Sequence, residues 1–133
     1  MLENFRTPTC VRLALLWASL MFLYIYNDYF SMYLPGTIEN MTAGRIGPLG
    51  EATDVVFVAV STVLAVPALM IFLSAALPPL ASKWLNVLLG LAYTAIEGLT
   101  FPGSALFYQI VVVMEIVVTL TIVWTALRWP RQA

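Results

Sequence analysis

Long apolar runs separated by short polar segments dominate this chain. A helix needs about 20 largely apolar residues to cross a bilayer. Four stretches approach or exceed this length, at about residues 11–33, 55–77, 84–101 and 105–127. The pattern therefore predicts an all-α fold in which residues 1–133 form a single integral membrane domain, a bundle of four transmembrane helices.

The four stretches differ in how cleanly they fit a membrane span. The second contains no charged residue, and the fourth contains only Glu115. The first must carry Asn27 and Asp28 to reach the far side of the bilayer. The third is short for a full span if it begins after Lys83. Polarity is therefore concentrated at a few positions inside the predicted helices.

The connecting segments are rich in residues that form turns. Residues 34–53 are polar and contain several glycines and prolines, so we expect an outer loop there. Shorter turns are expected at 77–83 and 100–104. Pro67 lies in the middle of the second predicted helix, where it removes one backbone hydrogen bond and predicts a bend. A neighbouring helix can satisfy the carbonyl that such a proline frees.

Basic residues are distributed unevenly between the two predicted sides. With four spans, both termini and the turn at 77–83 share one side. That side holds all but one of the six basic residues, namely Arg6, Arg12, Lys83, Arg128 and Arg131. Positive residues that flank spans mark the cytoplasmic face. We therefore expect a multi-pass protein of the inner (plasma) membrane with both termini in the cytoplasm.

The composition supports a membrane location and excludes several functions. The chain is 62% hydrophobic and only 10% charged, whereas a soluble domain is about 25% charged. The net charge of −1 offers no basic surface for nucleic acid. The sequence has no histidine, and Cys10 is its single cysteine. Haem ligation by histidine, Ser-His-Asp hydrolysis and an internal disulfide are therefore excluded, and no metal site or cofactor is predicted.

Three carboxylic acids lie inside the predicted helices: Asp28, Glu97 and Glu115. A charged side chain at the bilayer centre costs about 2.5–3.5 kcal/mol on insertion scales. Each acid is therefore expected to face the bundle interior or a wet cavity, or to carry a proton. A rise of about 1.5 Å per residue places Asp28 and Glu97 in the outer third of the membrane and Glu115 near its midplane.

Polar neighbours share helical faces with these acids. Tyr24 lies one turn before Asp28, and Tyr93 one turn before Glu97, so each tyrosine is expected to donate a hydrogen bond to its acid. Similar spacing gives the third helix an inward stripe that includes Asn86 and Gly90, the latter allowing close helix approach. The candidate ligand- or ion-binding residues are Asp28, Glu97, Glu115, Tyr24, Tyr93, Asn27 and Asn86.

Each candidate also has a structural explanation, and these alternatives stay open. Asp28 and Glu97 can be ordinary residues at the outer ends of their helices. A protonated Glu115 can serve packing alone through a hydrogen bond to a neighbouring helix. The amide of Asn86 can stabilise helix packing by hydrogen bonds to neighbouring helices.

Three segments carry a resemblance to a known family. They are "LALLWASLMFLYIYNDYFSM", "VPALMIFLSAALPPLASKWLNVLLGL" and "EIVVTLTIVWTALRWP". Together they resemble a family of uncharacterised bacterial integral membrane proteins, a domain of unknown function with four predicted spans. Asp28, Glu115 and Trp129 match that family's pattern, whereas Asn27 stands where the pattern has an alanine. The implied architecture is similar to DoxX-like four-helix bundles, and the resemblance implies no particular activity.

Three functions are compatible with the intramembrane acids. The first is a small transporter or channel subunit for protons or cations, which would enclose its route by forming a homodimer. The second is an intramembrane binding or enzyme module for a lipophilic ligand such as a quinone, an isoprenoid or a sterol-like molecule. The third is an accessory subunit of a larger membrane complex. No motif names a reaction, so a non-enzymatic role is favoured.

Overall fold

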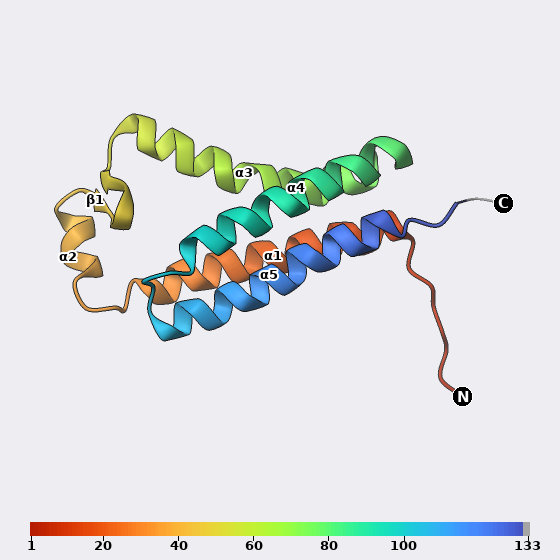
Figure 1. Cartoon of the computed structure of the whole chain (residues 1–133), viewed down its shortest axis with the longest axis horizontal. Helices are drawn as coiled ribbons and strands as arrows, with labels where there is room; N and C mark the ends of the chain where they lie inside the picture. The colour runs from red at the N-terminus through yellow and green to blue at the C-terminus, as the bar shows by residue number, and fades with distance from the viewer. Residues whose placement is uncertain (132–133) are drawn as a thin grey trace.

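The computed structural model describes residues 1–131 as four long helices joined by a structured loop and two short turns. The long helices are α1 (Thr9–Ser31), α3 (Asp54–Ala76), α4 (Pro79–Thr100) and α5 (Leu106–Leu127). Helix α5 packs along both α1 and α4, and α1 also packs against α3. Figure 1 shows the N-terminal segment and the C-terminal end of α5 at one end of the bundle, opposite the loop between α1 and α3.

Three of the described helices, α1, α3 and α5, are long and apolar enough to cross a membrane. They indicate a membrane protein. Helix α4 has a similar length, but its buried side is largely polar and lowers its hydropathy. The buried residues of α4 are Ser82, Asn86, Gly90, Tyr93 and Glu97. The predicted inward stripe is therefore confirmed, while a fourth crossing by α4 stays a prediction.

Helix α4 begins earlier than the sequence suggested. The expected start at about residue 84 is wrong, because the helix already begins at Pro79 and has 22 residues. Proline is favoured in the first helical turn, where its missing N–H is not needed. Lys83 lies inside the helix rather than at its start, and its ammonium is 5.2 Å from the ring centre of Trp84. At about 1.5 Å per residue, α4 is long enough to cross a hydrocarbon core.

The segment between α1 and α3 is more ordered than the expected loop at 34–53. It contains a short helix, α2 (Thr37–Thr42), and a small antiparallel hairpin of β1 (Arg45–Ile46) and β2 (Gly50–Glu51). A 3-10 turn, η1 (Gly47–Leu49), joins the two strands. Glycine at the boundary of β2 permits a φ of 80° at Gly50, a backbone conformation that other residues rarely adopt. These turn residues therefore build local structure at the end of the bundle.

Helices α4 and α5 approach each other closely at Gly90. A Cβ atom built on Gly90 would lie 2.6 Å from Cγ2 of Val123 and 3.3 Å from the carbonyl oxygen of Thr119. Only a residue without a side chain fits this crossing. The expectation that Gly90 allows close helix approach is confirmed.

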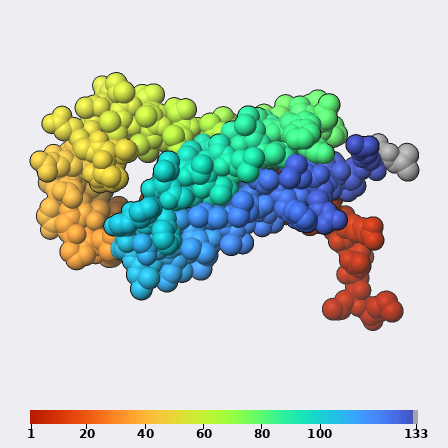
Figure 2. All heavy atoms as spheres, viewed as in Figure 1, coloured from red at the N-terminus to blue at the C-terminus, as the bar shows by residue number. Residues whose placement is uncertain are grey.

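Helix α3 packs through one half only. Its buried residues are Pro67, Met70 and Ser74, all in the second half of the helix. The first half diverges from α4, and the space-filling view shows an open gap there (Figures 1 and 2).

Candidate functional site

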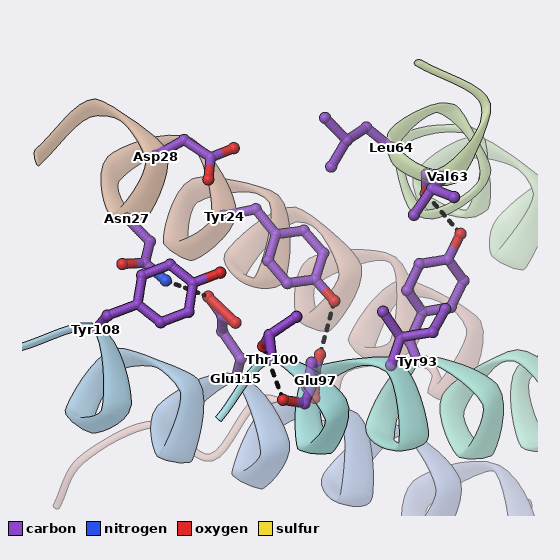
Figure 3. Close-up of a pocket in the computed structure, with 11 residues that line it drawn as sticks. Tyr24, Asn27, Asp28, Val63, Leu64, Tyr93, Glu97, Thr100, Tyr108 and Glu115 are labelled. Atoms are coloured by element: carbon purple, nitrogen blue, oxygen red, sulfur yellow. Dashed lines mark hydrogen bonds between the residues drawn. The ribbon is translucent and has the colours of Figure 1, made fainter. Parts of the chain in front are cut away.

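A cavity of about 120 Å³ lies among the four long helices. We call it the acidic cavity, because all three intramembrane acids line it (Figure 3). Its lining residues are Tyr24, Asn27, Asp28, Val63, Leu64, Tyr93, Ile96, Glu97, Thr100, Tyr108 and Glu115. This lining includes no lysine or arginine. The acids therefore meet around one space without a basic side chain among them.

Glu97 is held from two neighbouring helices. It is only 2% exposed. The hydroxyl of Tyr24 on α1 donates to Oε1 at 2.6 Å, and the hydroxyl of Thr119 on α5 donates to Oε2 at 2.9 Å. Thr94 Oγ1 lies 2.8 Å from Thr119 Oγ1 and extends this network back to α4. Both carboxyl oxygens of Glu97 therefore have donors, and the side chain ties three helices together.

Glu115 is equally buried but less completely bonded. It is 3% exposed, and the amide nitrogen of Asn27 donates to its Oε1 at 3.3 Å. Among the described residues, no hydrogen bond reaches its second carboxyl oxygen. Figure 3 shows the Glu115 side chain extending from α5 toward α1 and ending beside the Asn27 amide. One oxygen of a buried carboxyl thus remains available at the cavity.

The side-chain oxygen of Asn27 is a second hydrogen-bond acceptor without a donor in the described residues. Its side chain is 3% exposed, and its Oδ1 has no hydrogen-bond partner within residues 1–131. Leaving a buried acceptor unpaired costs about 1–3 kcal/mol. Asn27 stands where the family pattern has an alanine, yet of the pair Asn27 and Asp28 it is the buried residue.

Asp28 lies at the rim of the cavity. It is exposed, and no hydrogen bond to its carboxyl is found in the described part of the chain. Figure 3 shows its side chain on the side of the cavity that faces Leu64 of α3. The buried face of α1 follows Leu13, Trp17, Leu20 and Asn27. Asp28 therefore reaches the cavity from its rim, while the neighbouring Asn27 occupies the buried face of α1, because a 3.6-residue period permits either spacing.

The two tyrosines bond other partners than those expected. Tyr24 donates to Glu97 rather than to Asp28, and the hydroxyl of Tyr93 donates to the backbone carbonyl of Val63 rather than to Glu97. A tyrosine hydroxyl sits at the far end of a long, rigid ring. It therefore reaches a neighbouring helix more readily than a residue one turn away on its own helix.

Three participants in the site are not among the candidate binding residues named from the sequence. Tyr108 and Thr100 line the cavity, and Thr119 donates to Glu97. The available signal was helical spacing, since Thr119 lies one turn after Glu115 and Thr100 lies three residues after Glu97. Spacing within one helix does not show which residue of another helix will face it.

Asn86 lies in a separate group of polar residues. Trp17 Nε1 donates to Asn86 Oδ1 at 2.7 Å, and Asn86 Nδ2 donates to the carbonyl oxygen of Ser82 at 2.8 Å. Ser74 Oγ also donates to Asn86 Oδ1, at 3.3 Å. We call these four residues the Asn86 cluster. Asn86 does not line the acidic cavity, and its hydrogen bonds join α1, α3 and α4.

The acids surround the cavity without forming a metal shell. Within the part of the chain that the structure describes, no group of three or more histidine, cysteine, aspartate or glutamate side chains could hold a metal ion. Asp28, Glu97 and Glu115 come from three helices and face the cavity from different sides (Figure 3). A ligand that contacts all of them must therefore be larger than a single bare ion.

The fold and this cavity define a helical membrane protein with acidic groups enclosed between its helices. The chain belongs to a family of unknown function (DUF6326), whose family model matches residues 5–133. The expected membership of an uncharacterised family is thereby confirmed. No curated protein matches the chain, and no solved structure does. The similarity to DoxX-like bundles therefore stays a prediction.

Proposed function

We propose that this protein is a small transporter or channel subunit of the bacterial inner (plasma) membrane, which moves protons or other cations by way of the acidic cavity. In this proposal all four long helices cross the bilayer and both termini lie in the cytoplasm. The four helices have 22 or 23 residues each, which suits a span. Five of the six basic residues lie at the end that carries the termini.

The observation that carries the proposal is an acidic cavity whose lining has no basic residue. Acids inside a membrane bundle are costly unless they are paired, protonated or bound to a cation. Here Asp28, Glu97 and Glu115 line one space from three helices. A proton or a cation that enters the cavity supplies the positive charge that the chain itself does not place there.

The divergence of α3 supports access to the cavity. The first half of α3 diverges from α4 (Figures 1 and 2), and Val63 and Leu64 of α3 line the cavity. A second copy of the chain, arranged as a homodimer, would close that side and turn the open gap into a route. A larger membrane complex could close it in the same way.

Flux measurements test this function. Purified protein in proteoliposomes is expected to carry protons or small cations down an imposed gradient, and Glu115→Gln is expected to reduce that flux at least tenfold. Glu39→Gln is the matched control, because Glu39 lies in α2 away from the cavity and is exposed. Equal flux for the wild type and Glu115→Gln would count against the proposal.

A lipophilic ligand is the second candidate, favoured by the apolar part of the cavity lining. Val63, Leu64 and Ile96 line the cavity beside the tyrosines, and helical bundles bind ligands between their helices. A quinone, an isoprenoid or a sterol-like molecule would place a polar head at the acids and its tail in the gap beside α3. Mass spectrometry of lipids that co-purify with the protein tests this alternative, and a protein free of such molecules opposes it.

A further inference from the structure

We infer that the acidic cavity binds a small organic monocation that carries several N–H donors, of the guanidinium class. This inference rests on the proposed function and names the class of cation that the cavity selects. It follows from the unmet acceptors, the charge, the size and the aromatic lining of the same space.

The hydrogen-bond acceptors at the cavity determine the chemistry of a bound molecule. Asn27 is only 3% exposed, and its Oδ1 is a buried acceptor without a partner among residues 1–131. The second carboxyl oxygen of Glu115 also receives no hydrogen bond in that part of the chain. A bound molecule that donates hydrogen bonds can reach the Glu115 oxygen and the unbonded Asp28 carboxyl at the rim, and it reaches the buried Asn27 Oδ1 only if that amide turns toward the cavity. A molecule that only accepts hydrogen bonds satisfies none of these groups.

The spacing of the acids requires a ligand with donors on several sides. Asp28 lies at the rim on α1, while Glu115 faces the interior from α5 (Figure 3). Among the described residues, no group of three or more acidic, cysteine or histidine side chains could hold a bare metal ion. A guanidinium ion is planar and presents N–H groups along all its edges, and paired N–H groups match a carboxylate with two parallel hydrogen bonds. It can therefore contact separate carboxyls at once.

Size and lining favour a small, flat cation. The cavity volume is about 120 Å³, and a cavity of about 150 Å³ holds a benzene molecule. Guanidinium and methylguanidinium are smaller than benzene and fit this volume. Tyr24, Tyr93 and Tyr108 line the space, and aromatic rings attract cations that lie over their faces. A planar cation can stack on such a ring while its edges reach the acids.

Three probes of similar size separate charge from hydrogen bonding. Guanidinium, urea and tetramethylammonium are titrated into the purified protein in lipid nanodiscs, with binding followed by calorimetry. Urea keeps the N–H donors but has no charge, and tetramethylammonium keeps the charge but has no N–H donor. Guanidinium is expected to bind at least tenfold more tightly than either. Equal binding of urea or of tetramethylammonium would overturn the inference, and so would the absence of guanidinium binding.

Substitutions of the acids that line the cavity test whether guanidinium binds there. Asp28→Asn and Glu115→Gln are each expected to weaken guanidinium binding at least tenfold, while Glu51→Gln in β2 leaves it unchanged. Asp28 is exposed and unbonded among the described residues, so its substitution leaves the fold intact even if Glu115→Gln lowers stability. Unchanged affinity for Asp28→Asn and Glu115→Gln would place the binding elsewhere and refute the assignment.

The outcomes for the inference and for the proposed function can be told apart. Proton flux that depends on Glu115 without any guanidinium binding refutes the inference and leaves the proposed function standing. Guanidinium binding that depends on the acids, in a protein without any flux, supports the site and refutes the transport role.

Discussion

The hydroxyl of Tyr93 donates a hydrogen bond of 2.5 Å to the backbone carbonyl of Val63. Val63 lies four residues before Pro67, which is inside α3. A proline has no N–H, so the carbonyl four residues earlier has no donor from its own helix. Tyr93 of α4 supplies that donor. The expectation that a neighbouring helix satisfies the carbonyl freed by Pro67 is therefore confirmed.

Tyr93→Phe is expected to destabilise the protein by about 1–2 kcal/mol. The variant keeps the ring but leaves the part-buried Val63 carbonyl without a donor. The loss is measured as the change in unfolding free energy, by denaturant titration in mixed micelles with circular dichroism as the signal.

Pro67→Ala provides the control for this assignment. Alanine restores the backbone N–H at position 67, so the Val63 carbonyl regains a partner within α3. In the Pro67→Ala background, Tyr93→Phe should cost clearly less than in the wild type. Equal costs in the two backgrounds would show that Tyr93 stabilises the fold by another contact.

Gly90→Ala is expected to cost about 1–3 kcal/mol of unfolding free energy. The new methyl group meets Cγ2 of Val123 at 2.6 Å and the Thr119 carbonyl at 3.3 Å, so the Val123 side chain or the spacing of α4 and α5 must shift. Gly98→Ala is the matched control, because nothing lies within 4 Å of the position that its new methyl group would take. Alanine is the better helix former, so Gly98→Ala should be neutral or stabilising. A similar loss for both variants would contradict close packing at Gly90.

Asn86→Leu separates a structural role from a ligand-binding role. The variant removes the acceptor of Trp17 Nε1 and the donor to Ser82, and unpaired buried groups cost about 1–3 kcal/mol each. We expect lower thermal stability with an unchanged guanidinium affinity in calorimetry, since Asn86 does not line the acidic cavity. A large loss of guanidinium affinity in a well-folded variant would show that Asn86 contributes to the binding site.

Cysteine labelling tests the proposed membrane topology. Cys10 is the only cysteine, so Cys10→Ser provides a background without thiols. In this background Glu51→Cys should react with a membrane-impermeant maleimide in intact spheroplasts, whereas Leu2→Cys and Arg131→Cys should react only after lysis. Labelling of Leu2→Cys and Arg131→Cys on opposite sides would rule out an even number of crossings.

The positions of the long helices were predictable because each one needs a continuous apolar run. The end of α5 at Leu127 agrees with the predicted boundary. The start of α4 was missed because Lys83 resembles a helix boundary in a hydropathy pattern. Its ammonium can reach water from within the helix, since a long lysine side chain extends toward the membrane surface. Charge alone is therefore a poor marker of where a membrane helix begins.

The candidate site was only partly predictable. Because a charged side chain is costly inside the bilayer, Glu97 and Glu115 are predicted to face the bundle interior, and both are buried. The choice between Asn27 and Asp28 depends on the rotation of α1 by a single position, which a short polar segment does not specify. The partners of Tyr24 and Tyr93 depend on how α1, α3 and α4 lie against each other. Such relationships between helices leave no local pattern in the sequence.

The early half of α3 has one consequence for how the molecule must be handled. Because that half diverges from α4 (Figure 2), in the proposed topology acyl chains of the host bilayer would border the side of the acidic cavity that Val63 and Leu64 line. The surrounding lipid would then form part of the environment of the site. Detergents with short tails would change that environment, so affinities measured in nanodiscs and in small micelles should differ.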